Sequence, residues 1–374
     1  MHFSISKENF AQLLYLTNTI VERKNTMPIL ANVKLTAEAG KLTVAATDLE
    51  VSLVGEAEAT VKTPGSITVD AKVLYDIIRE LPSQAITVTE SKRQRLDIEC
   101  GQSRFKINGT SADEFPNIAG VELRNPVSVD ASKFYQMFDK TAFAVSTDET
   151  RYNINGVFAE TTEGSLGPGK KCLRLVATDG HRLAMIDRPA EGFSIEQSVI
   201  VPRKGIQELK KVLEDNEGSA KVSVSDGFFT VQSGLVTLGV RLVDGQFPDY
   251  KQVIPLESTT TIQVPRTDFL SAVKRVSLVT TDKTKAVKCK VMEGSLVVSS
   301  QSPEYGEATE TISVEQTGED LTIGFSAKYL LDLLGAMSGS EMITLKLKGE
   351  LGPGVFIGSG DELYTCIVMP MRFE

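Results

Sequence analysis

Three stretches of the chain repeat one pattern of apolar and polar positions. Each begins with a short alternating segment, continues with a polar residue and ends with apolar residues at helical spacing. The alternation predicts a strand, and the spacing predicts an amphipathic helix. The first large apolar residue of each helix is a phenylalanine, at Phe10, Phe134 and Phe269, so the copies start 124 and then 135 residues apart. A period of that length is a whole domain, which makes a ring-like or arched set of three modules the first hypothesis.

A second strand and helix follow in the latter half of each copy, at residues 67–78, 199–209 and 323–334. Alternating segments such as 85–90, 221–225 and 342–346 predict further strands. Each domain is therefore expected to hold two half-copies, with helices on one face and antiparallel sheet on the other. The predicted class is α+β, with domains at residues 1–123, 124–256 and 257–374 and no low-complexity linker between them.

Composition narrows the chemistry. Apolar residues make up 41% of the 374 positions, and no apolar run approaches the length of a membrane span or a secretory signal. The four cysteines (Cys100, Cys172, Cys289 and Cys366) are scattered, which predicts buried free thiols in a reducing cytoplasm. His2 and His181 are the only histidines, so a histidine-rich metal site or catalytic network is hard to build. We expect no metal, no cofactor and no membrane partner.

The charge is unevenly distributed along the chain. The whole chain carries −9, but the six predicted helices together carry +6, which leaves −15 on the remainder. If the six helices lie on one face of the protein, that face is basic while the rest of the protein is acidic. A surface that binds phosphate groups needs such a basic face. Ordinary solvated helix faces are the alternative interpretation. Tryptophan is absent and aromatic residues are 6%, so stacking platforms for single-stranded nucleic acid are poorly supplied.

Two motifs could suggest catalysis, and neither is convincing. Residues 164–171 nearly match the phosphate-binding loop, but Lys171 replaces the metal-binding hydroxyl and a strand follows in place of a helix. Residues 178–182 bring Asp, His and Arg together, yet the counterpart Thr47-Asp48 lacks the histidine and no nucleophile is evident. We interpret the first as a hairpin tip and the second as a turn. No catalytic residue is predicted. An NTP-dependent DNA enzyme and a scaffold repeat protein without nucleic acid remain the alternatives.

The C-terminus is apolar almost to its end. Residues 366–368 predict a final strand, and the following Met369-Pro370-Met371 favours an adaptable binding surface, because methionine conforms to varied partners. Chain ends are normally polar.

These motifs together resemble a known family over the whole chain. The most specific segments are residues 27–30, 177–183, 199–205, 242–250 and 368–372. They resemble the bacterial sliding clamp, the β subunit of DNA polymerase III. The resemblance implies a head-to-tail homodimeric ring of six domains that is not an enzyme. Duplex DNA would thread the hole, held by backbone contacts without sequence preference.

The resemblance also implies partners and site residues. The partners would be the polymerase III catalytic subunit, the clamp loader, and other polymerases and repair proteins that carry short clamp-binding peptides. DNA contacts map to Lys24, Arg151, Tyr152, Arg203 and Lys204. The peptide pocket maps to Ile154, Thr178, Gly180, His181, Arg182, Leu183, Pro248, Val253, Ser326, Tyr329, Val368, Met369, Pro370, Met371 and Arg372.

Three positions depart from the family's usual residues. Gln252 stands where an arginine is common, Thr284 where a phenylalanine occurs, and Asp148 where a glutamine is familiar. The first two predict a pocket rim with somewhat different peptide preferences, and the third weakens one expected DNA contact.

A dimer contact can be placed by strand alternation. Phe105 and Ile107 alternate with Arg104 and Lys106, so the two apolar side chains share one face. We expect them to meet Leu278 and Val279 of a second copy, just after the first helix of domain three. The alternative is that all four are ordinary core residues.

Overall fold

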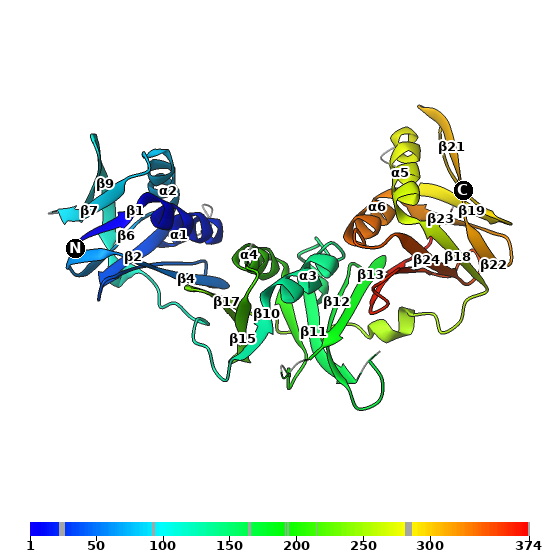
Figure 1. The fold of residues 1–374 in the computed structure, drawn as a ribbon, viewed down its shortest axis with the longest axis horizontal. Coiled ribbons are helices and arrows are strands. Elements are labelled where there is room, and N and C mark those ends of the chain that lie inside the picture. The colour runs from blue at the N-terminus through cyan, green and yellow to red at the C-terminus, as the bar shows by residue number, and fades with distance from the viewer. Residues whose placement is uncertain are drawn as a thin grey trace. The chain divides into compact units, whose positions relative to one another are not determined.

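The computed structural model describes residues 1–21, 27–91, 94–163, 166–190, 192, 194–214, 216–280 and 286–372 (Figure 1). Two of the singled-out residues, Lys24 and Thr284, lie outside these ranges. The chain divides into two compact units. Unit 1 is Met1–Tyr135 with Lys204–Leu242, and unit 2 is Gln136–Arg203 with Val243–Glu374.

The described residues contain six α-helices, one at each of the six places where the sequence predicts a helix. They are α1 (Lys7–Ile20), α2 (Ala71–Glu80), α3 (Ala131–Ala142), α4 (Arg203–Leu213), α5 (Arg266–Val276) and α6 (Ala327–Ala336). Their start residues follow from capping. The side chains of Ser6, Asp70 and Asp130 each accept a hydrogen bond from the backbone N–H three residues on, which stabilises the first turn.

Unit 1 is built on one antiparallel sheet whose order is β10-β15-β16-β17-β4-β3-β2-β6-β9-β8-β7-β1-β5. Its strands are β1 (His2–Ser6), β2 (Asn32–Glu38), β3 (Lys41–Thr47), β4 (Val51–Glu58), β5 (Thr60–Thr63), β6 (Gly65–Asp70), β7 (Ala85–Ser91), β8 (Arg95–Cys100), β9 (Ser103–Ser111), β10 (Val127–Asp130), β15 (Ser219–Ser225), β16 (Phe228–Ser233) and β17 (Val236–Arg241).

Unit 2 has a nine-stranded sheet in the order β14-β11-β12-β13-β26-β25-β24-β18-β22 and a four-stranded sheet in the order β21-β20-β19-β23. The first contains β11 (Gly156–Glu163), β12 (Lys171–Thr178), β13 (Arg182–Pro189), β14 (Val199–Pro202), β18 (Thr260–Pro265), β22 (Glu315–Gly318), β24 (Met342–Leu347), β25 (Gly354–Gly358) and β26 (Tyr364–Val368). The second contains β19 (Ala286–Met292), β20 (Ser295–Ser302), β21 (Gly306–Ser313) and β23 (Leu321–Ser326).

Strand pairing joins successive copies of the repeat. In unit 1, β17 of the second copy pairs with β4 of the first, from Val236↔Gly55 to Val240↔Val51. In unit 2, β26 of the third copy pairs with β13 of the second, from Arg182↔Val368 to Ile186↔Tyr364. Adjacent copies are therefore connected by shared sheets as well as by the chain.

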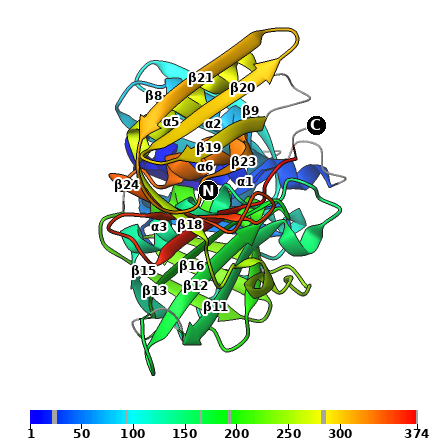
Figure 2. The ribbon, with the colours of Figure 1, turned by 90° about the vertical axis from the view of Figure 1, so that its right-hand side faces the viewer.

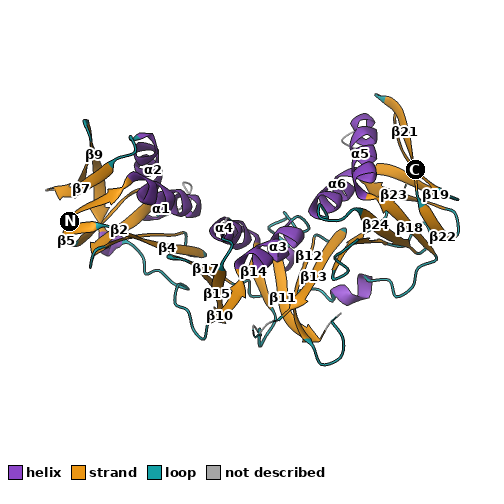
Figure 3. Cartoon of the chain, viewed as in Figure 1, coloured by secondary structure: helices purple, strands orange, loops and turns teal. Residues whose placement is uncertain are grey.

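The helices bury the apolar residues that defined the repeat. Phe10 and Phe269 are fully buried and Phe134 nearly so. In unit 1 α1 packs on α2, and in unit 2 α5 packs on α6. Figure 3 shows these two helix pairs, each on one side of its neighbouring strands. The expected separation into a helical face and a sheet is confirmed for both pairs.

Several strands have a paired neighbour on one side only, and two of these edges, on β9 and β21, bear on assembly. β9 pairs with β8 over residues 103–108 but with β6 only over residues 109–111, so its first half has a single neighbour. β21 pairs along its length with β20 alone and lies at the margin of its sheet (Figure 2). Such edges are templates for pairing with another chain.

The four proposed dimer residues are not core residues. Phe105 is 38% exposed and Leu278 is 77% exposed, while Ile107 and Val279 are half-buried. The core alternative is therefore wrong for this chain.

Candidate functional site

Unit 2 contains an apolar cavity of about 190 Å³ formed by separate segments of the chain. The segments are the turn between β12 and β13, the short helices η3 (Tyr152–Ile154) and η4 (Tyr250–Val253), and the end of β26. The lining residues are Arg151, Ile154, Thr178, Gly180, Arg182, Leu183, Pro248, Asp249, Tyr250, Val253, Ile367 and Met369. Eight of them were predicted for the peptide pocket from the resemblance.

Strand register brings the C-terminus to this cavity. β26 runs antiparallel to β13, with Leu183 opposite Ile367. Beyond the strand, the backbone N–H of Met369 donates to the carbonyl of His181 at 2.8 Å, which holds the methionine beside the β12–β13 turn. The Met369 side chain stays 38% exposed. The cavity thus has an ordered apolar wall that a partner can still reach.

The turn at residues 178–182 is fixed by its own side chains. The Thr178 hydroxyl donates to the Arg182 carbonyl at 2.6 Å, and Asp179 Oδ1 accepts the N–H groups of His181 and Arg182 at 2.9 and 3.1 Å. Gly180 has φ +91, and a Cβ there would lie 2.8 Å from the Arg151 guanidinium. Only glycine fits this left-handed, crowded position without strain. The prediction of a turn is confirmed.

Arg182 connects the turn to α6. It is 7% exposed, and its guanidinium donates to Asp179 Oδ2 at 3.0 Å, to Asp332 Oδ2 at 2.6 Å and to the Phe143 carbonyl at 2.6 Å. It also lies over the Tyr329 ring, 4.5 Å from the centroid. These contacts with Asp179, Asp332, Phe143 and Tyr329 are all within the protein, so Arg182 shapes the cavity wall and holds α6 beside it.

Tyr250 is held at the cavity floor by a buried polar network. Its hydroxyl donates to Glu160 at 2.6 Å and accepts from Arg174 at 3.1 Å, while Arg174 makes a bidentate pair with Asp187 at 2.7 Å per bond. Burial, assisted by the bond to Glu160, raises the pKa of Tyr250 above its ordinary value. The phenol therefore stays neutral, and its ring is fixed between the apolar residues of the floor.

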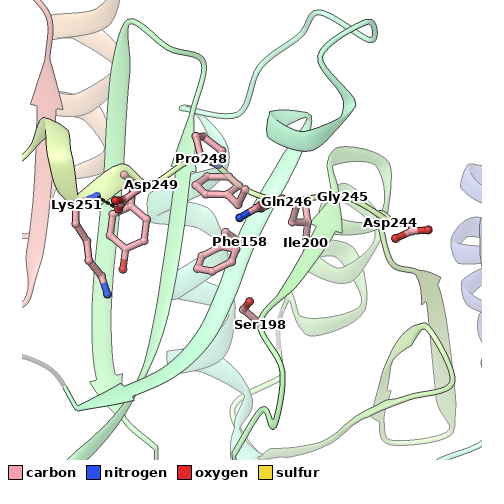
Figure 4. A pocket seen from close by; sticks show the side chains of 11 residues that line it. Phe158, Ser198, Ile200, Asp244, Gly245, Gln246, Pro248, Asp249 and Lys251 are labelled. Atoms are coloured by element: carbon pink, nitrogen blue, oxygen red, sulfur yellow. Dashed lines mark hydrogen bonds between the residues drawn. The ribbon is translucent and has the colours of Figure 1, made fainter.

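A second cavity, of about 400 Å³, adjoins the first and shares Pro248, Asp249 and Tyr250 with it. Figure 4 shows the segment from Asp244 to Lys251 along its rim, with Phe158 and Ile200 below. Phe158 stacks on Phe247 with ring centroids 4.8 Å apart. The aromatic stack supports the segment that carries Pro248 into the first cavity.

The other residues assigned to the peptide pocket do not line the cavity. Tyr329 stacks on His181 with centroids 6.4 Å apart, so both lie next to the turn. Burial raises the pKa of Tyr329. Val368 and Ser326 are buried. The residues after Met369, which are Pro370, Met371 and Arg372, continue away from β26, and the Met371 N–H donates to the Gly324 carbonyl at 2.8 Å.

The residues assigned to DNA contacts are exposed to different degrees. Tyr152 is 60% exposed and Arg203 is exposed at the start of α4. Arg151 lies on the cavity rim, where its guanidinium donates to the Asp179 carbonyl at 2.9 Å. Lys204 forms an ion pair with the buried carboxylate of Asp48.

Two of the three departing positions can be described. The carboxylate of Asp148 accepts from the hydroxyl and the N–H of Thr150, at 2.6 and 3.0 Å, and these bonds lower its pKa. Asp148 is therefore an anion bonded within its own loop. The Gln252 amide donates to Asp249 Oδ2 at 3.0 Å, on the cavity rim.

Three lining residues were missed by sequence reasoning, namely Asp249, Tyr250 and Ile367. Asp249 and Tyr250 belong to the quoted segment 242–250, so the signal was present but only Pro248 was taken from it. Ile367 gave no signal, because Cys366, Ile367 and Val368 are all buried and alternation cannot tell which faces the cavity.

The described residues contain no group of three or more His, Cys, Asp or Glu that could hold a metal ion, and none of their helices is long and apolar enough to cross a membrane. β11 and β12 pair as far as Glu163↔Lys171, so the segment between them joins two paired strands, as predicted for a hairpin tip, although its residues 164 and 165 lie outside the described ranges. The four cysteines are buried free thiols, as expected.

The fold and the site define a protein of repeated α+β modules with an apolar binding cavity. Family models for the DNA polymerase III beta subunit match the chain in sequence order: the N-terminal domain at residues 1–119, the central domain at 128–249 and the C-terminal domain at 251–372. The chain belongs to this family, the β sliding clamps, which are non-catalytic processivity factors of the replicative polymerase.

Curated relatives and solved structures agree over the full length. The beta sliding clamps of Caulobacter vibrioides and Pseudomonas putida are both 35% identical, with 100% of both chains covered. The Caulobacter crescentus clamp structure has a TM-score of 0.94 at 34% identity and covers 100% of this chain and 99% of its own. A Bartonella birtlesii clamp bound to griselimycin has a TM-score of 0.93 at 34% identity, with both chains fully covered.

Proposed function

We propose that this chain forms a head-to-tail homodimeric ring around duplex DNA and tethers the replicative polymerase, the clamp loader and other polymerases or repair proteins through short peptides. The main support for the tethering role is the apolar cavity in unit 2. It is apolar, reachable from solvent and built by ordered segments. Short apolar peptide segments bind such pockets because buried anchors dominate the affinity. The replication role and the buried free thiols support a cytoplasmic location.

The exposed edges of β9 and β21 support the ring. Each has unpaired backbone groups, so β9 of one copy can pair with β21 of another. Exposed residues of opposite charge lie on the two strands, Lys106 on β9 and Glu307 on β21. Arg104 and Glu310 pair with Glu99 and Arg275 of their own copy. The exposed Phe105 and Leu278 supply apolar area. A contact between two different surfaces must close to avoid a filament, and two copies close it with two-fold symmetry.

Two points support the DNA role. α4 begins with the two cations Arg203 and Lys204, and the family that the chain resembles is expected to contact the DNA backbone without reading bases. Arg203 is the clearest candidate, because it is exposed on the first turn of α4. Contacts to phosphates alone carry no sequence information, which permits sliding.

The cavity is tested by replacing Met369 with alanine. We expect Met369→Ala to weaken binding of a short apolar clamp-binding peptide by about 2 kcal/mol, or roughly 30-fold. The shorter side chain would no longer contact the apolar residue by which the peptide is anchored in the cavity. The measurement is a titration followed by fluorescence anisotropy.

Met371→Ala is the matched control, because Met371 is 37% exposed, close to the 38% of Met369, but does not line the cavity. Its affinity should stay within a few-fold of wild type. If Met369→Ala binds the peptide as wild type does, the cavity is not the docking site. A larger loss in Met371→Ala than in Met369→Ala would move the site toward the end of the chain.

A further inference from the structure

Lys204, a proposed DNA contact, is held by a carboxylate from another domain of the repeat. Lys204 is the second residue of α4 and Asp48 follows β3, yet the Lys204 ammonium pairs with Asp48 Oδ2 within unit 1. The side chain of Asp48 is 4% exposed and that of Lys204 is 27% exposed. A buried ion pair of this kind is screened far less than a surface pair, so Asp48 neutralises much of the lysine's charge.

Asp48 is available for this role because its turn needs only one of its two oxygens. Oδ1 accepts the N–H groups of Glu50 and Val51 at 2.9 and 2.6 Å. The Thr47 hydroxyl donates to the Val51 carbonyl at 3.1 Å, which closes the turn as Thr178 does in the second copy. Oδ2 is left to face the helix.

The second copy shows the same turn with a different cation. There Asp179 Oδ1 accepts two N–H groups, and Oδ2 accepts from Arg182 Nε at 3.0 Å, on the same hairpin. The residue that corresponds to Arg182 in the first copy is Val51, which cannot pair with a carboxylate. Asp48 therefore takes its cation from α4.

We propose that Asp48 is a positioning residue for DNA binding: it holds and neutralises Lys204, so that duplex phosphate must compete with Asp48 for this cation. The inference rests on the proposed DNA-encircling function. Asp48 would limit the strength of the contact between Lys204 and a DNA phosphate. A protein that slides along DNA needs phosphate contacts that are weak and exchange easily.

The test is Asp48→Asn. The asparagine oxygen keeps the acceptor that closes the turn, and its amide replaces only the oxygen that faces Lys204. We expect the slope of log affinity against log salt for duplex DNA to steepen by about 0.9, one added cation–phosphate contact. Between 50 and 200 mM salt, Asp48→Asn should lose roughly 3.5-fold more affinity than wild type.

The double variant Asp48→Asn with Lys204→Ala identifies the cation responsible. It should lose the added slope, because Lys204 itself is absent. Removing the lysine alone leaves a buried carboxylate without its partner, so Lys204→Ala should melt at a lower temperature than the double variant. Circular dichroism checks that each variant is folded.

A matched control separates this effect from a change in net charge. Glu56→Gln, also in unit 1, removes one carboxylate and releases Lys41 from a pair at 2.9 Å that is much more exposed. It should leave the salt slope at the wild-type value.

The outcomes are distinct. A wild-type slope in Asp48→Asn, or an added slope that survives in the double variant, overturns the role of Asp48 while leaving the DNA function in place. An equal gain in Glu56→Gln also overturns it, since the effect is then one of net charge. A wild-type protein that does not bind duplex DNA overturns the proposed function and this inference with it.

Discussion

Asp361 shows how one residue can tie several elements together. Its carboxylate accepts from Lys140 of α3 at 2.6 Å and from Arg188 of β13 at 2.7 Å, just before β26 begins. The Tyr364 hydroxyl donates to the Lys140 carbonyl at 2.6 Å, so the same corner is bonded twice. Burial alone would raise the pKa of Asp361, but the two cations outweigh it and the pKa lies below the ordinary value of 3.8.

This pKa predicts a stability effect in acid. The folded state binds the Asp361 proton less readily than the unfolded state, so the stabilisation is fully present above about pH 4 and is lost as pH falls through the lower folded pKa. We expect the difference in melting temperature between wild type and Asp361→Asn to be largest near neutral pH and to shrink below pH 4. Thermal melts from pH 7 to pH 3 measure it. A difference that grew on acidification would contradict the assignment.

At the scale of elements, the helices were predictable and the pairing between copies was not. A helix start here is a polar residue followed by an apolar residue one turn on, and both signals are local, as Ser6 and Phe10 illustrate. The pairing of β17 with β4 joins residues about 180 positions apart, and alternation alone names no partner. The same limit hid Ile367, whose orientation depends on the register with β13.

The charge of α4 illustrates another limit of reading one element at a time. Counted within the helix, Lys204 and Lys211 add two positive charges. In the structure Lys204 pairs with Asp48, and Lys211 pairs with the buried Glu208 at 2.8 Å. Lys210 lies over the Tyr135 ring, 5.6 Å from its centroid. Arg203 is the exposed cation of α4, so we expect any contact of this helix with DNA to depend most on it.

That expectation can be measured. Arg203→Ala should lower the slope of log affinity against log salt by about 0.9, with little change in melting temperature because the side chain is exposed. Lys288→Ala, an exposed cation on β19, is the control and should not alter the slope. Identical slopes for Arg203→Ala and wild type would remove Arg203 from the set of DNA contacts.

At the scale of the whole molecule, the proposed dimer uses residues that a single copy leaves exposed or half-buried. We predict that Ile107→Asp combined with Leu278→Asp gives a folded monomer that no longer stays on circular duplex DNA. Placing aspartates in an apolar contact should cost several kcal/mol, enough to open a modest interface. Sedimentation velocity measures the dimer, and retention on nicked circular DNA measures the ring.

Leu351→Asp supplies the matched control, because Leu351 is 70% exposed on unit 2 and lies outside the proposed contact. This variant should remain dimeric. A dimer that survives both aspartates would place the interface elsewhere, and an unfolded double variant would contradict the exposure of these side chains.

The shared sheets also bear on how such a chain can change its number of modules. A repeat in sequence suggests a part that can be copied or deleted as a block. Here the two junctions use corresponding strands: β4 and β13 each follow a Thr-Asp turn, and β17 and β26 are each the last strand of their copy. Deletion of the second copy would leave the edges of β4 and β26, which are the same two kinds of strand that pair at each junction. A change in the number of modules would therefore preserve the kind of pairing that joins one copy to the next.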